Sequence, residues 1–140
     1  LFFFPNWQYN LTGLIAKSSW YQGAWFYHME AGFAFADRDD KFLVGWSPVL
    51  AQYKFLDPKR NWGPNVLVGA GFAMTNWKDV AERELGSEFQ FTLHGGVGLE
   101  YFKGKGAYSI NYRYFHVSNA AIQSPNIGLN AHLFTLGMRF

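Results

Sequence analysis

The sequence predicts an all-β fold, an eight-stranded antiparallel transmembrane β-barrel of the bacterial outer-membrane type. Two long segments, residues 25–35 and 89–101, alternate between an apolar side chain and a polar or small one. Successive side chains of a strand point to opposite faces, so each segment has one apolar face. Such strands exceed the about five or six residues usual in soluble proteins and can cross a tilted bilayer.

The composition supports the same class. Aromatic residues make up 21% of the chain and charged residues 16%, while the mean hydropathy is only −0.12. No segment approaches the roughly 18 consecutive apolar residues of a membrane-spanning helix. A water-soluble barrel, the main alternative, would have to point its aromatic face inward, and eight strands cannot enclose that many rings.

The alternation predicts one closed barrel domain over residues 1–140, with seven strands and the end of an eighth at residues 1–4, since bacterial single-chain barrels have even strand numbers. A shift of apolar parity around Pro48 predicts a β-bulge. The seven strands are expected near residues 7–17, 24–36, 42–55, 64–77, 88–102, 106–118 and 129–140.

Other classes are excluded or not indicated. The chain has no cysteine, which excludes disulfides and thiolate metal sites, and its net charge of +2 gives no indication of nucleic-acid binding. An outer-membrane protein needs an export signal, and none is visible at the start of this sequence, so we expect that one has been removed.

Connection lengths predict the orientation. Turns on the periplasmic side of such barrels are short and extracellular loops are longer. We therefore expect residues 119–128 outside, the turn at residues 103–106 in the periplasm with Lys103 and Lys105 simply solvated, and the C-terminal Phe140 in the periplasm.

Polar side chains gather on the lipid-facing side of the last two strands. His116 and Ser118 share the outward face of one strand, and Asn130 and His132 share that of the next. Because polar groups facing lipid are costly, they are functional candidates. Ester hydrolysis requires a nucleophile, a base and a group that orients the base. Ser118 is the candidate nucleophile and His116 the base; either Asn130 or His132 is the orienting group.

The oxyanion of such a reaction needs hydrogen-bond donors, for which the Asn119 side chain and backbone amides are candidates. A His-x-Ser pair is weak evidence by itself, because polar side chains at a strand end can simply lie in the headgroup layer. Five acidic or histidine residues alternate onto the inner faces and could suggest a metal site, but an ion-pair network with Arg113 and Arg139 is favoured in a filled small barrel. These residues are His28, Glu30, Glu88, His94 and Glu100.

The run His-Val-Ser-Asn-Ala at 116–120, followed by Pro125-Asn126-x-Gly128, resembles the signature of the PagL-type lipid A 3-O-deacylases. Weaker similarity at residues 46–49, 69–71 and 85–87 extends the resemblance over residues 24–140. It implies an outer-membrane barrel with a lipid-facing serine-esterase site, lipid A of lipopolysaccharide as substrate within the outer-membrane lipid, and no metal or cofactor. It also implies Ser118 as nucleophile, His116 as base and Asn119 as an oxyanion contributor.

Two positions depart from the family pattern. The best-known members carry Glu where this chain has Asn130, and Gly where it has Ala121. Asn can orient a catalytic His but cannot stabilise imidazolium by charge, whereas Ala121 keeps the backbone N–H that would support the oxyanion. The alternative is therefore a catalytically inactive barrel that acts as a structural or partner-binding membrane subunit. A pore is disfavoured, because side chains fill an eight-stranded interior.

Overall fold

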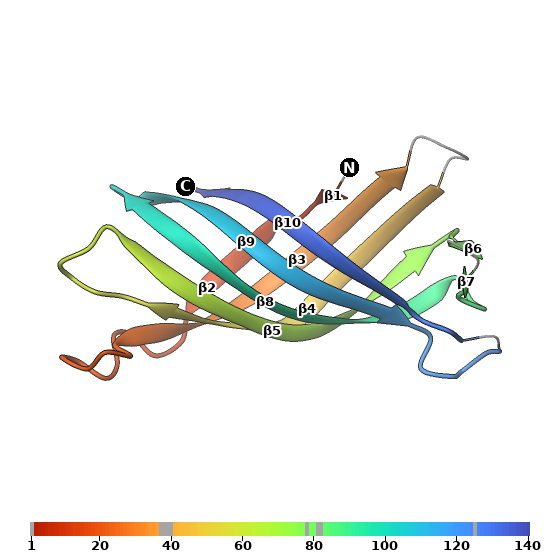
Figure 1. Cartoon of the computed structure of the whole chain (residues 1–140), viewed down its shortest axis with the longest axis horizontal. Coiled ribbons are helices and arrows are strands. Elements are labelled where there is room, and N and C mark those ends of the chain that lie inside the picture. Colours follow the sequence, from red (N-terminus) through yellow and green to blue (C-terminus); the bar gives the residue numbers. More distant parts are fainter. Residues whose placement is uncertain (1, 37–40, 78, 81–82, 125) are drawn as a thin grey trace.

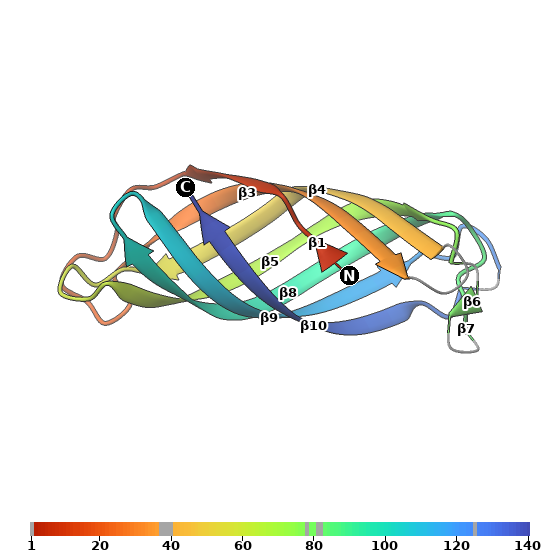
Figure 2. The same cartoon turned by 90° about the horizontal axis from the view of Figure 1, so that it is seen from above.

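The computed structural model describes residues 2–36, 41–77, 79–80, 83–124 and 126–140, and it forms an antiparallel sheet of eight strands curled into a half-barrel (Figures 1 and 2). A separate hairpin of β6 (Asp79–Val80) and β7 (Arg83–Glu84) projects from one end. No helix in the described residues is long and apolar enough to span a bilayer. The strands of the main sheet are β1 (Phe2–Phe3), β2 (Asn6–Asn10), β3 (Gly23–Ala36), β4 (Lys41–Phe55), β5 (Trp62–Thr75), β8 (Phe89–Lys103), β9 (Gly106–Ser118) and β10 (Leu129–Arg139).

Six of the strands lie within two residues of their predicted bounds, but the first does not. A strand was expected to run to residue 17, whereas β2 ends at Asn10 and residues 11–22 form a loop with one isolated bridge. The Asn10 Oδ1 accepts hydrogen bonds from the backbone N–H groups of Thr12 and Gly13, which starts a turn in place of the strand ladder. Gly13 then takes a positive φ of 63°, which is incompatible with an extended strand.

The bulge predicted at Pro48 is confirmed. The pairing of β4 with β5 loses its regular register between Trp46 and Val49, so one stretch of β4 is longer than its partner. The Tyr27 hydroxyl donates a hydrogen bond to the carbonyl oxygen of Pro48, which this irregularity leaves accessible. Beyond the bulge, Val49 points outward and Leu50 inward, as the parity shift requires.

Side chains along the long strands alternate between an outer, exposed face and an inner, buried one. In β8, Phe89, Phe91 and Leu93 are exposed while Gln90 and Thr92 are buried. An apolar exterior with a polar interior is the pattern of a membrane barrel. The exterior positions predicted from the sequence are confirmed as at least partly exposed: Trp25, Tyr27, Phe89, Phe91, Tyr112 and Phe134.

Ion pairs fill the interior, as predicted. The Arg113 guanidinium binds both carboxylate oxygens of Glu30. Glu100 receives Arg139 at 3.4 Å and also the Lys54 ammonium at 2.6 Å, a partner that the sequence reasoning did not anticipate. In the Arg113–Glu30 and Lys54–Glu100 pairs both side chains are buried, so the opposite charges compensate one another there, whereas Arg139 is partly exposed. The described residues contain no group of three or more His, Cys, Asp or Glu that could hold a metal ion.

A closed barrel was expected, but in the described residues no strand pairing joins the two edges of the sheet. Both β1 and β2 pair with β3, so the eight strands occupy seven rows. In an antiparallel sheet, the first and seventh rows run in the same direction, so no antiparallel ladder can join them. The inward side chains of β10 are accordingly only half-buried, whereas those of β8 are largely buried.

Candidate active site

The candidate site lies on the outer face of β9 and β10, at the end of the sheet that carries the β6–β7 hairpin (Figure 1). His116 and Asn130 are directly opposite Cα partners on the two strands. The His116 Nδ1 lies 2.6 Å from the Asn130 Oδ1. An amide oxygen can only accept, so this contact requires the proton on Nδ1 and leaves the Nε2 lone pair available to take a proton.

Ser118 is the last residue of β9 and lies two residues beyond His116 on the same face. Both side chains are partly exposed, while the intervening Val117 is buried on the inner face. No hydrogen bond joins Ser118 to His116 within the described chain. Catalytic contacts are often loose without substrate, so their separation does not exclude cooperation.

Gly128 packs against this pair and was not singled out by the sequence reasoning. It has a φ of 67°, and a Cβ placed on it would lie 3.2 Å from the His116 Cε1 and 3.6 Å from the Ser118 Cβ. A side chain there would press on the imidazole as well as strain the backbone. The sequence did contain an indication of this role, because Gly128 is the last residue of the motif that carries the family resemblance.

Asn119 organises the loop that follows Ser118. Its side chain is 1% exposed and donates to the carbonyl oxygens of Leu85, at 2.9 Å, and Gln123, at 2.7 Å. Its Oδ1 accepts the Ala121 N–H at 3.0 Å, and its own N–H binds the Asn126 Oδ1 at 3.1 Å. Asn119 therefore fixes the loop after Ser118 both internally and against Leu85, next to β8.

These bonds bear on the predicted oxyanion donors. Both amide hydrogens of Asn119 and the N–H of Ala121 are engaged within the protein, so each would have to exchange its partner to serve a substrate oxygen. Ala120 takes a φ of 53° and is exposed, and its N–H has no partner within the described chain. The Ala120 N–H is therefore a donor already available beside Ser118, which the sequence reasoning did not identify.

His132 does not contact His116. Its Nδ1 lies 2.6 Å from the Tyr112 hydroxyl, and its ring stacks on that of Tyr112 and meets Tyr114 edge-on. Of the two candidates for the orienting group, the structure thus brings Asn130 to the imidazole. His132 lies two residues farther along β10, opposite Tyr114 and among aromatic rings.

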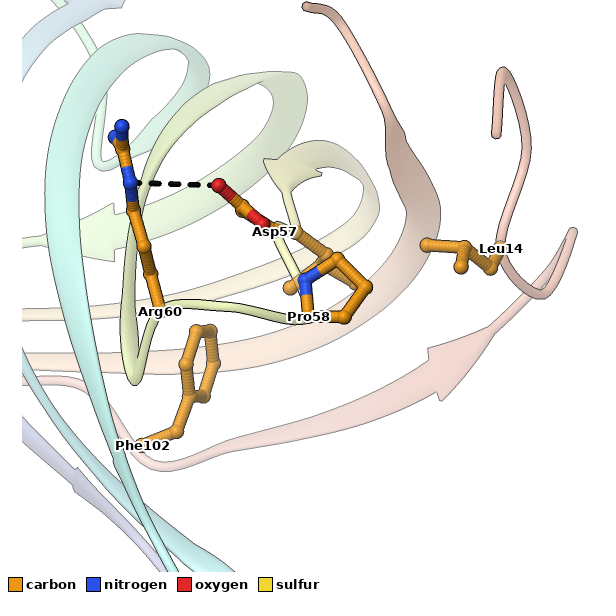
Figure 3. Close-up of a pocket in the computed structure, with 6 residues that line it drawn as sticks. Leu14, Asp57, Pro58, Arg60 and Phe102 are labelled. Atoms are coloured by element: carbon orange, nitrogen blue, oxygen red, sulfur yellow. Dashed lines mark ion pairs between the residues drawn. The ribbon is translucent and has the colours of Figure 1, made fainter. Parts of the chain in front are cut away.

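A cavity of about 260 Å³ lies at the opposite end of the sheet and is lined by Leu14, Leu56, Asp57, Pro58, Arg60 and Phe102 (Figure 3). It holds none of the candidate residues. Because Phe102 alternates with the outward-facing Tyr101, its side chain belongs to the inner side of the sheet. The smaller cavity beside Phe4, Glu30 and Phe115 is likewise not lined by His116, Ser118 or Asn130.

Comparison with known proteins bears on the fold and the family of this chain. The family model described as lipid A 3-O-deacylase (PagL) matches residues 2–139. The lipid A deacylase PagL of Pseudomonas aeruginosa is 28% identical over 121 residues, which make up 81% of this chain and 66%, just under two thirds, of that protein. A solved structure, the crystal structure of the outer membrane enzyme PagL, superposes with a TM-score of 0.73 at 19% identity, over 99% of this chain and 89% of the other. The chain belongs to the lipid A 3-O-deacylase (PagL) family.

Proposed function

We propose that this chain is an outer-membrane serine esterase that removes a 3-linked acyl chain from lipid A. The observation that carries the proposal is the 2.6 Å contact between the His116 Nδ1 and the Asn130 Oδ1, on the outer face and two residues from Ser118. A hydroxyl, an oriented imidazole and a lipid-facing position are the elements that ester hydrolysis beside a bilayer requires.

The reaction follows from these groups. The Ser118 Oγ attacks the ester carbonyl carbon while the His116 Nε2 accepts its proton. The resulting oxyanion is stabilised by the Ala120 N–H, together with Asn119 and Ala121 if they exchange their present partners. The C–O bond to the sugar then breaks as His116 returns the proton to the leaving hydroxyl. Water then attacks the acyl-serine carbonyl carbon while His116 takes a proton from it; the bond to the Ser118 Oγ breaks, His116 returns the proton to that oxygen, and the fatty acid is released.

Apolar neighbours support an acyl substrate. On β8, Phe91 is the Cα partner of Ser118, and Leu93 is that of His116; both are exposed on the outer face. A chain whose ester carbon lies at Ser118 can therefore lie along these side chains. The proposed orientation has residues 119–128 outside the cell and the C-terminus in the periplasm, because lipid A occupies the outer leaflet.

The test is the mass spectrum of lipid A after incubation with the purified protein in mixed vesicles. We expect loss of one 3-hydroxyacyl mass from the wild type and none from Ser118→Ala, with the variant still folded because an exposed hydroxyl contributes little to stability. Equal release by both proteins would exclude Ser118 as the nucleophile.

The neutral Asn130 favours one second candidate, a catalytically inactive family member that acts as a structural or partner-binding subunit of the outer membrane. A carboxylate in place of Asn130 would stabilise imidazolium and restore activity if only this group were lacking. If the wild type releases no acyl chain and Asn130→Glu restores none, the subunit role replaces the enzyme role.

A further inference from the structure

The two ends of the molecule differ in charge. At the end opposite the candidate site, the loops, the turn and the strand ends beside them carry one acid, Asp57, and six basic residues, of which only Arg139 is paired with an acid deeper in the sheet, Glu100. The six are Lys17, Lys59, Arg60, Lys103, Lys105 and Arg139. At the site end, the described residues Lys41, Asp79, Arg83, Glu84 and Glu88 comprise three acids and two bases. We refer to the first as the basic end. Such a separation creates a field that attracts anions to one end of the molecule only.

A row of aromatic side chains borders the basic end on the outer face. Trp62, Tyr101 and Tyr108 are successive Cα partners across β5, β8 and β9, and they are 43%, 47% and 51% exposed. Trp and Tyr collect where hydrocarbon meets the polar headgroups, because their rings are apolar and their N–H or O–H groups are polar. This aromatic row therefore marks the level of a membrane interface.

Cations lie just beyond the aromatic row. Lys103 follows Tyr101 by two residues on the same face, and Lys105 lies in the adjoining turn. At about 3.4 Å per residue, Lys103 is roughly 7 Å past the row, where lipid phosphates lie. Neither lysine has an acidic partner in the part of the chain that the structure describes, although each was expected only to be solvated.

Arg60 completes this arrangement. Its guanidinium lies 5.4 Å from the centre of the Trp62 ring. Its Nε lies 3.3 Å from the Asp57 Oδ2, and Figure 3 draws this ion pair as a dashed line. Both side chains of this ion pair are about half exposed, so water screens it and the guanidinium still has unused N–H donors. Stacking on Trp62 holds those donors beside the aromatic row.

We propose that the aromatic row with Arg60, Lys103 and Lys105 is a binding site for the headgroup of an anionic glycerophospholipid. The rings contact the glycerol and upper acyl region, and the cations bind the phosphate. Its assignment to phospholipid rather than lipid A rests on the proposed function. With the esterase site in the lipid A leaflet, the basic end lies in the other leaflet, which consists of glycerophospholipids.

The experiment uses the protein in phosphatidylcholine bilayers that contain a minor fraction of brominated phosphatidylglycerol or brominated phosphatidylcholine. Each brominated lipid quenches the fluorescence of nearby tryptophans. The quenching of Trp62 is the difference between the fluorescence quenched in the wild type and that quenched in Trp62→Phe. We expect phosphatidylglycerol to associate at least about fivefold more strongly, since one cation near a membrane surface contributes about that factor. High salt should reduce the preference.

In the double variant Lys103→Gln/Lys105→Gln, brominated phosphatidylglycerol and brominated phosphatidylcholine should quench Trp62 to nearly the same extent. The matched control, Lys41→Gln/Arg83→Gln, changes the net charge equally, but both positions lie at the site end of the sheet, so the preference should remain. Equal quenching of the wild type by both lipids, or an equal loss in the control, would overturn the site. Because no acyl release is measured, failure of this proposal and failure of the esterase proposal are separate results.

Discussion

Replacing Asn130 by Asp tests the proposed mechanism most directly. The substitution puts a carboxylate oxygen where the amide oxygen now lies, 2.6 Å from the His116 Nδ1. The carboxylate is charged at rest, but it meets an opposite charge only as the imidazolium develops. Two unit charges about 4 Å apart attract by about 4 kcal/mol at an effective dielectric constant of about 20, and a partly developed charge beside water reduces this to about 1–2 kcal/mol. That difference corresponds to an increase in kcat of roughly 5- to 30-fold.

The same carboxylate affects folding. A charge at the bilayer centre costs about 2.5–3.5 kcal/mol, and less toward the interface. Asn130 is the second residue of β10 and lies near one end of the strand, so the smaller cost applies. The rate must accordingly be measured per folded protein, with the folded fraction taken from urea unfolding in lipid vesicles.

The assay is the initial rate of fatty-acid release from lipid A, with Ser118→Ala as background. Asn130→Leu is the matched control, because it keeps the volume and removes the acceptor, and its rate should fall below that of the wild type. If Asp, Asn and Leu at position 130 give equal rates while Ser118→Ala is inactive, Asn130 does not orient His116 and the reasoning is refuted.

Three further predictions concern other parts of the molecule. Gly128→Ala should lower kcat by about 10- to 100-fold with the fold retained, since its Cβ would lie 3.2 Å from His116 and displace the imidazole; unchanged kinetics would contradict this. Arg113→Met should lower the free energy of unfolding by about 3–5 kcal/mol, because it leaves the Glu30 carboxylate buried and unpaired. The double variant Glu30→Leu/Arg113→Met should recover most of that loss in urea titrations, and no recovery would count against the pair. A cysteine at Gln123 should react with an impermeant maleimide on intact cells, whereas reaction only after lysis would reverse the proposed orientation.

Alternation predicted most of the fold because membrane strands separate apolar from polar side chains strictly. It predicted β9 to the residue and placed His116 and Asn130 on one face. It failed for residues 11–17, where apolar residues continue but Asn10 captures two backbone N–H groups and turns the chain. The periodicity of a sequence gives no information about a side chain that competes with a neighbouring strand for backbone hydrogen bonds.

The candidate site was only partly predictable for a similar reason. Parity places Asn130 and His132 on the same face but does not say which of them reaches His116. That choice depends on the Tyr112 hydroxyl, which occupies the His132 Nδ1. The four bonds that tie Asn119 to its loop likewise depend on loop geometry, for which the sequence has no periodic signal.

In the part of the chain that the structure describes, β10 pairs with β9 alone, and this has a consequence for dynamics. A strand held by one ladder opens locally at lower free energy than strands paired on both sides, and Asn130 lies on this strand while His116 lies on doubly paired β9. Amide hydrogen exchange should therefore be faster along β10 than along β8 or β9. Each local opening of β10 near residue 130 breaks the hydrogen bond between His116 and Asn130. The opening rate of this one strand therefore sets how long the imidazole stays oriented. A neighbour that covers this edge would slow the exchange and lengthen that lifetime without touching the site.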